Sequence, residues 1–162
     1  MPETPTFNFE IDKTDREIIT ILTENANTPY TEIAKRLIIS SGTVHVRMKR
    51  LKRLGVVKSS TLLFDHTKLG YDLTAFLGVF LDKGSVYQKV IAELKKIPEV
   101  VEAHYTTGKY SIFVKVICRN TMHLRDVLNE KIQAIPGVQS TETIVSLEES
   151  IKRQVAIPPG SR

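Results

Sequence analysis

Residues 28–57 read TPYTEIAKRLIISSGTVHVRMKRLKRLGVV, and their pattern predicts the fold of the first half of the chain. It holds two runs of apolar residues at the spacing of a buried helix face, which are Ile33, Ala34 and Leu37, followed by Val44, Met48 and Leu51. Proline is favoured at the first position of a helix, and threonine and serine at its N-cap, so Thr28 is expected to cap the first helix ahead of Pro29, and Ser40 the second. Two helices joined by so short a turn predict a helix-turn-helix motif.

The second of these helices, residues 41–54, carries its positive charge on the side away from its apolar residues. In a helix-turn-helix motif this helix enters the major groove of duplex DNA, where long cationic side chains reach phosphates and guanine edges. Residues 33–64 hold eight Lys and Arg and no Asp or Glu, a charge of +8 in a chain whose net charge is +5. A solvated basic helix face is the alternative. The candidate DNA contacts are Ser41, Gly42, Thr43, His45, Val46, Arg47, Lys49, Arg50 and Arg53.

The segments on either side complete a winged helix-turn-helix domain. Residues 12–25 predict a helix, because isoleucine and leucine recur at mostly helical spacing and Asp15 and Glu17 favour a helix N-terminus. The β-branched residues of segment 56–64 predict a strand pair, the wing. We therefore expect a flexible N-terminus at 1–10, a DNA-binding domain at 11–65 and a linker at 66–73.

The second half of the chain predicts a ferredoxin-like domain. Apolar, β-branched runs bounded by turn residues predict strands, and runs with helical spacing predict helices. The strands are expected at 74–81, 100–106, 111–118 and 138–147, and the helices at 85–97 and 121–135. The order βαββαβ is the split βαβ motif, here spanning 74–150 and followed by a tail at 151–162. The predicted fold class is α+β.

Both faces of the expected sheet are apolar, which predicts self-association. Phe76 and Phe80 lie on one face of the first strand, and Leu77 and Val79 on the other. Two helices cover only one face of a four-stranded sheet, so the second face needs another cover. The simplest cover is the same sheet of a second copy, and we expect a homodimer that presents two DNA-binding heads.

Composition argues against disulfide-bonded, zinc-binding, secreted and membrane-spanning classes of protein. One cysteine, Cys118, cannot form an intramolecular disulfide or a cysteine-ligated zinc site, and it favours a reducing compartment. No apolar run approaches the roughly 18 residues of a membrane span, and the N-terminus has no signal-peptide pattern. We expect a cytoplasmic protein with no cofactor, no metal and no membrane partner.

At this level of detail the chain resembles the Lrp/AsnC, or feast/famine, family of bacterial and archaeal transcription regulators. The matching stretches, in family order, are 11–22, 28–34, 40–44, 47–57, 68–71, 107–110 and 135–143. The resemblance implies a DNA-reading N-terminal domain and an effector-sensing C-terminal domain. It also implies dimers that assemble further, often into octamers, in a nucleoid-associated protein.

Family members bind small effectors, typically amino acids, between dimers. The resemblance places that site at the Gly-x-Tyr-Asp loop and the Thr-x-Thr strand, which correspond here to Thr107, Gly108, Lys109, Tyr110, Ser111, Thr141 and Thr143. Two positions depart from the family pattern. Ser111 replaces an aspartate, so an amino-acid ammonium group would lose a carboxylate partner, and Ile38 replaces the usual glycine of the helix-turn-helix turn.

Two other functions compete with an effector-responsive regulator. An architectural DNA-binding protein would keep the fold and lack an effector, which the change at Ser111 favours. Sirohaem-type tetrapyrrole decarboxylases share the two-domain layout and would use histidine and arginine. Here the four histidines are scattered along the chain with no paired carboxylate or nucleophile–base spacing, so we expect no enzymatic activity.

Overall fold

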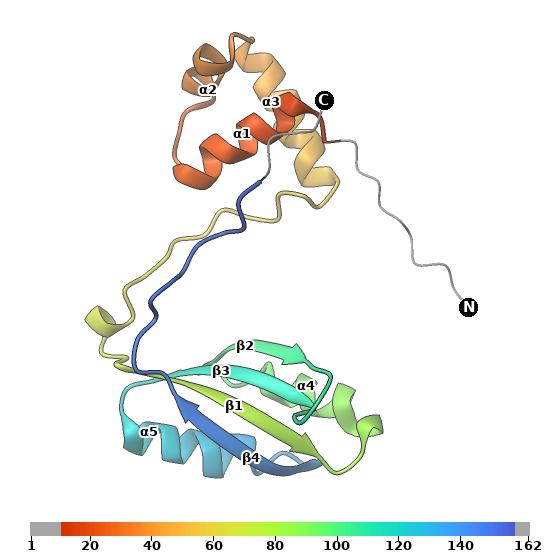
Figure 1. The fold of residues 1–162 in the computed structure, drawn as a ribbon, viewed down its shortest axis with the longest axis vertical. Coiled ribbons are helices and arrows are strands. Elements are labelled where there is room, and N and C mark those ends of the chain that lie inside the picture. Colours follow the sequence, from red (N-terminus) through yellow and green to blue (C-terminus); the bar gives the residue numbers. More distant parts are fainter. Residues whose placement is uncertain (1–10, 158–162) are drawn as a thin grey trace. The chain divides into compact units, whose positions relative to one another are not determined.

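The computed structural model describes residues 11–157, and the segments 1–10 and 158–162, including the expected flexible N-terminus and the end of the tail, lie outside the described residues. The described chain forms two compact units, one of residues 11–62 with 152–157 and one of residues 63–151 (Figure 1). Each is described by itself below. The α+β fold class is confirmed, with three helices in the first unit and a four-stranded sheet in the second.

The first unit is a bundle of three short helices, α1 (Lys13–Glu24), α2 (Tyr30–Leu37) and α3 (Ser41–Arg53). The Asp12 carboxylate caps α1 by accepting a 2.8 Å hydrogen bond from the Asp15 N–H, and the Ser40 hydroxyl caps α3 by accepting one of 3.0 Å from Thr43. One buried cluster consists of Ile18, Ile33, Ala34, Val44, Met48 and Leu51, and Leu37, also expected on a buried face, is partly buried and packs against it.

Two details of this unit differ from prediction. The Thr28 hydroxyl does not cap α2; it donates to the Asn25 carbonyl, and α2 begins after Pro29. The strand pair expected at 56–64 is wrong, because the structure has no strand there. The N–H groups of Val56 and Val57 both donate to the Leu51 carbonyl, closing the end of α3, and a strand needs a partner that the described part of this unit does not supply.

The second unit has the predicted βαββαβ order. Its elements are β1 (Leu73–Leu81), α4 (Tyr87–Leu94), β2 (Val100–Tyr105), β3 (Ile112–Cys118), α5 (Thr121–Asp126), a π-helical continuation (Val127–Ile132) and β4 (Val138–Val145). Short 3₁₀ turns at Thr67–Leu69 and Gly84–Val86 precede β1 and α4. The strands pair antiparallel in the order β2-β3-β1-β4, the ferredoxin-like topology.

One face of the sheet forms the core of this unit. Ala75, Leu77 and Val79 of β1 and alternate residues of β3 are buried in a single cluster with the apolar residues of α4, α5 and the π-helical turn. The helices therefore cover the face that the odd-numbered residues of β1 present (Figure 1).

The other face of the sheet, which we call the open face, carries Phe76, Gly78 and Phe80 of β1. Strand register places Phe113 beside Gly78 from one side, and Ile144 beside Phe76 from the other. The rings of Phe76 and Phe113 stack with their centroids 5.7 Å apart. The apolar character predicted for both faces of the first strand is thus present, and this face holds a row of aromatic side chains.

Candidate DNA-binding surface and ligand loop

Helix α3 presents one ridge directly opposite its buried residues. Gly42, Val46, Lys49 and Arg53 follow each other by four, three and four positions, and all four are exposed. Ser41 and His45 are also exposed beside this ridge, whereas Thr43 is only partly so. The ridge therefore offers small, apolar and cationic groups to an approaching molecule, in that order from the helix N-terminus.

Two predicted DNA contacts, Arg47 and Arg50, are held by α1 instead of pointing freely outward. Asp15 has no exposed side-chain surface, and its two carboxylate oxygens accept hydrogen bonds from Arg47 Nη1 at 2.9 Å and Arg50 Nη1 at 2.8 Å. Arg47 also pairs with Asp12 at 2.5 Å. The exposed fractions of the two arginine side chains are 26% and 37%. Helices α1 and α3 are thus joined by a network of four charged groups, which we call the Asp–Arg network.

The network shifts the pKa values of Asp12 and Arg47, each in the direction that favours the charged form of the side chain. Burial alone would raise the pKa of Asp12, but hydrogen bonds from Arg47 and from the Asp15 N–H outweigh it and lower the pKa. Hydrogen bonds to Asp12 and Asp15 raise the pKa of Arg47. In the sequence, Asp15 indicates only a preference for a helix N-terminus. No local pattern indicates that two arginines more than 30 positions away would bind it.

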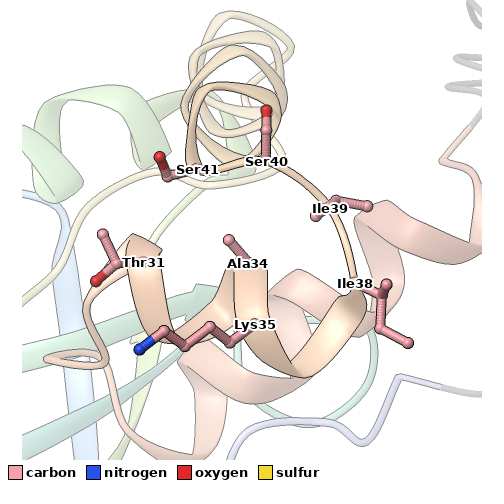
Figure 2. Close-up of a pocket in the computed structure, with 7 residues that line it drawn as sticks. All are labelled: Thr31, Ala34, Lys35, Ile38, Ile39, Ser40 and Ser41. Atoms are coloured by element: carbon pink, nitrogen blue, oxygen red, sulfur yellow. The ribbon is translucent and has the colours of Figure 1, made fainter.

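The turn between α2 and α3 is strained at the position where the family usually has glycine. Ile38 adopts φ 54° and ψ 47°, the left-handed region that β-branched residues rarely enter, and the residue is 92% exposed. Figure 2 shows this residue at the turn, beside a hollow lined by Thr31, Ala34 and Lys35 of α2 and by Ser40 and Ser41 at the start of α3. The helix-turn-helix geometry is kept in spite of the isoleucine.

Replacing Ile38 with glycine is expected to raise the free energy of unfolding of this unit by about 1 kcal/mol. A side chain in the left-handed region costs roughly 1–2 kcal/mol, and glycine removes that cost. Part of the gain is lost because glycine also increases the conformational entropy of the unfolded chain. Urea denaturation followed by circular dichroism measures the change. An Ile38→Ala variant keeps the positive-φ cost and serves as the control. Equal stability of the glycine and alanine variants would contradict the account.

The exposed His45 is engaged on one side. Its ring meets the Tyr30 ring edge-on with centroids 4.6 Å apart, which links α3 to the first turn of α2. Elsewhere on α2, Arg36 pairs with Glu32 one turn earlier. Lys49 and Arg53 appear in no ion pair among the described residues, so they are the most available cations of the ridge.

The loop predicted to bind an effector joins β2 to β3 and is folded back onto the open face. The Thr106 hydroxyl donates to the Tyr110 carbonyl at 2.7 Å, and the Ser111 N–H donates to the Val79 carbonyl at 3.0 Å. The Tyr110 ring lies over Gly78, where a Cβ atom would come within 2.3–2.6 Å of three ring atoms. Gly78 therefore leaves the space that Tyr110 fills.

A charged pair stands at the rim of this loop. Lys109 Nζ lies 2.5 Å from Glu142 Oε2 and 5.2 Å from the centre of the Tyr110 ring. The hydrogen bond to Glu142 raises the pKa of Lys109, and hydrogen bonds from Lys109 and Tyr110 lower the pKa of Glu142. The Thr-x-Thr motif does not indicate this carboxylate, because Glu142 occupies the variable position between Thr141 and Thr143.

The predicted effector residues lie on two sides of the sheet. Strand register pairs Thr141 with Val79 and Thr143 with Leu77, which places both threonines on the helix-covered face. The Gln133 amide donates to the Thr141 hydroxyl at 2.7 Å. Glu142, between them, faces the same side as Gly78 and approaches the loop. The structure therefore brings Lys109, Tyr110 and Glu142 together and sets the threonines apart from them.

Within 11–157, no three His, Cys, Asp or Glu side chains come close enough together to hold a metal ion. Over that range, none of the helices has both the length and the apolar character that crossing a membrane requires.

Comparison with known proteins assigns both units. A family profile described as "Winged helix-turn-helix DNA-binding" matches residues 11–58, and one described as "Lrp/AsnC ligand binding domain" matches residues 74–156. The regulatory protein AsnC of Haemophilus influenzae is 45% identical over 145 residues, covering 90% of this chain and 97% of the relative. The regulatory protein AsnC of Escherichia coli K12 is 43% identical over 148 residues, with coverages of 91% and 97%.

Solved structures agree with this assignment. The structure of E. coli AsnC superposes with a TM-score of 0.87 at 41% identity, covering 91% of this chain and 99% of that one. The feast or famine regulatory protein Rv3291c of M. tuberculosis, solved with L-methionine, superposes with a TM-score of 0.84 at 25% identity and coverages of 91% and 99%. The chain belongs to the Lrp/AsnC family and is a DNA-binding transcription regulator with the family's ligand-binding domain.

Proposed function

We propose that the chain contacts duplex DNA through the ridge Gly42, Val46, Lys49 and Arg53. The observation that supports this is the position of the ridge opposite the buried face of α3, in a segment of +8 charge without an acidic residue. The small and apolar residues at the helix N-terminus admit close approach to base edges, and the cations further along reach phosphates. Ser41, Thr43 and His45 flank the ridge and stay candidate contacts. Arg47 and Arg50 also stay candidates, because they line a hollow beside the ridge while they link α3 to α1.

Lys49→Ala and Arg53→Ala are each expected to weaken binding to genomic duplex DNA and to reduce the slope of log affinity against log salt by about one. Fluorescence anisotropy at several salt concentrations measures both quantities. Lys89→Ala, an exposed lysine on α4 in the other unit, is the matched control and leaves the slope unchanged. Unaltered affinity and slope for both ridge variants would exclude this surface.

The ligand that regulates DNA binding is, in our proposal, an amino acid bound near the 107–111 loop. The ligand-binding family profile and the L-methionine complex of Rv3291c support this class of ligand. The candidate residues stay Thr107, Gly108, Lys109, Tyr110, Ser111, Thr141 and Thr143, to which we add Glu142. Lys109 and Glu142 supply one charge of each sign, which suits a zwitterion and gives its ammonium group a carboxylate that Ser111 lacks.

Selection of bound fragments from genomic DNA, with and without each common amino acid, tests DNA reading and effector response together. A recovered operator whose occupancy changes with one amino acid supports the regulator. The architectural alternative is favoured if no amino acid changes the occupancy of the operator and none shifts the thermal unfolding temperature of the protein.

We further propose that the open face pairs with that of a second copy. The helices of the described chain leave one apolar surface of the sheet uncovered, formed by Phe76, Phe80, Phe113 and Ile144. Two identical sheets packed face to face would bury this surface. Dimers of this kind are the expected unit of a larger assembly such as an octamer. Sedimentation velocity over a concentration series measures the assembly size.

We infer that the protein acts by binding and not by catalysis, in the cytoplasm and in association with the nucleoid. The relatives are regulators, and the four histidines of the sequence are scattered with no nucleophile–base spacing. Titration with a tetrapyrrole tests the decarboxylase alternative, since bound tetrapyrrole colours a protein. The proposed domain boundaries are those of the sequence, with the DNA-binding domain at 11–65 and the ligand-binding domain at 74–150.

A further inference from the structure

Arg47 shares one nitrogen between two carboxylates that differ in their access to water. Its Nη1 lies 2.5 Å from Asp12 Oδ2 and 2.9 Å from Asp15 Oδ1. The Asp15 side chain has no exposed surface, whereas that of Asp12 is 50% exposed. If Arg47 separates from Asp12, water can hydrate the Asp12 carboxylate, whereas the Asp15 carboxylate would be left buried without a partner.

The same groups line a surface hollow beside the ridge. The hollow is bounded by Asp12, Gly42, Thr43, Val46, Arg47 and Arg50. It therefore adjoins the N-terminal half of α3, where a DNA strand that contacts the ridge would pass. An anion entering the hollow meets Arg47 and, next to it, the carboxylate of Asp12.

The charges of the Asp–Arg network cancel in the free protein. Two arginines and two aspartates give a net charge of zero, although the sequence of α3 alone counts both arginines as positive. Without the Asp12 charge the network would carry one net positive charge at the edge of the hollow. Asp12 thus decides how strongly this part of the surface attracts a phosphate.

We propose that Asp12 is a built-in competitor of the DNA backbone: a phosphate takes the place of its carboxylate on Arg47, while Asp15 keeps the guanidinium aimed at the hollow. This inference rests on the proposed DNA contact of α3. By holding Arg47 in the absence of DNA and repelling phosphate in its presence, Asp12 lowers affinity for any sequence. It leaves discrimination to the ridge residues, because phosphate contacts are independent of sequence.

The test uses Asp12→Asn in the full chain. Asparagine caps a helix as well as aspartate does, so the hydrogen bond to the Asp15 N–H is kept and the charge is removed. Asp12→Ser, which also caps, is a second variant against misfolding of the first. Glu17→Gln is the matched control, because it makes the same change in net charge on α1, at a residue two positions from Asp15 and therefore on a different face.

We expect Asp12→Asn and Asp12→Ser to tighten binding to mixed-sequence duplex DNA about three- to tenfold at about 50 mM salt, and to steepen the log–log salt slope by about 0.9, the value for one further phosphate neutralised. Glu17→Gln should change affinity less than about twofold. Wild-type affinity and slope in both Asp12 variants would overturn the proposal. Weaker binding would also overturn it, since Asp12 would then be an aid to Arg47.

These outcomes are separable from failure of the DNA contact itself. A wild-type chain that binds no duplex at low salt removes the proposed role of the ridge. If the wild-type chain binds duplex DNA and both Asp12 variants bind it with the same affinity and salt slope, only the proposed role of Asp12 as a competitor is overturned. Thermal unfolding of each variant, compared with wild type, shows whether the α1 cap has been kept.

Discussion

Asp15→Ala is expected to lower the free energy of unfolding of the three-helix unit by about 3 kcal/mol. The carboxylate is fully buried and accepts charge-assisted hydrogen bonds from Arg47 and Arg50, so its removal deletes both bonds and the link between α1 and α3. Breaking a buried ion pair costs about 3–5 kcal/mol, and the lower end applies because both arginines retain contact with water. Chemical denaturation followed by circular dichroism measures the loss.

Two further variants make this prediction specific to the carboxylate. Asp15→Asn keeps the volume and one acceptor oxygen, and an intermediate loss of about 1–2 kcal/mol is expected. Glu24→Ala, an exposed position at the end of α1, should stay within about 0.5 kcal/mol of wild type. An Asp15→Ala chain as stable as Glu24→Ala would contradict the structural role of the network. Loss of DNA binding should accompany the unfolding of α3 in the alanine variant.

Gly78→Ala is expected to destabilise the ligand-binding domain by about 2 kcal/mol, within the roughly 1–3 kcal/mol that overpacking costs. A Cβ atom here would lie 2.3, 2.4 and 2.6 Å from Cδ1, Cε1 and Cγ of Tyr110, so the ring must leave its place on the open face. If that face is the dimer interface, the displaced ring also weakens the dimer. Denaturation measures the first effect, and sedimentation equilibrium the second.

The double variant Gly78→Ala/Tyr110→Ala identifies the cause. Removing the ring removes the clash, so the two substitutions together should cost about 1–2 kcal/mol less than the sum of their separate costs. Gly84→Ala makes the same chemical change at a glycine with no atom within 4 Å of the added Cβ, and it should stay within about 0.5 kcal/mol of wild type. Additive costs would show that Tyr110 is not what Gly78 accommodates.

Most of the fold was predictable because its causes are local. The spacing of Ile33 and Ala34, and of Val44 with Met48, predicts buried helix faces, and Ser40 caps α3 as expected. The order of strands and helices in the second half likewise follows from runs of apolar residues between turns. The wing was mispredicted at 56–64 since β-branched composition is only a local preference, whereas a strand also needs a partner in space.

The candidate sites were predictable only in outline. The exposed ridge of α3 follows from helical spacing, and period two puts Thr141 and Thr143 on one face of β4. Which face that is depends on the register with β1, which pairs them with Val79 and Leu77 and turns Glu142 toward Lys109. The effector residues named by the family motif are therefore divided by the sheet.

The two-domain α+β architecture, the basic segment and the family could all be inferred from the amino-acid sequence, since each depends on residues close together in the chain. The pairing of the charged side chains, in contrast, depends on how the helices pack. The sequence alone predicts that Arg47 and Arg50 are free cations, but in the folded unit they pair with Asp12 and Asp15, which lie 32 to 35 positions away in the chain. A buried carboxylate attracts whatever cation the packing of the helices places beside it, and that choice is a property of the packed helices and not of either segment alone.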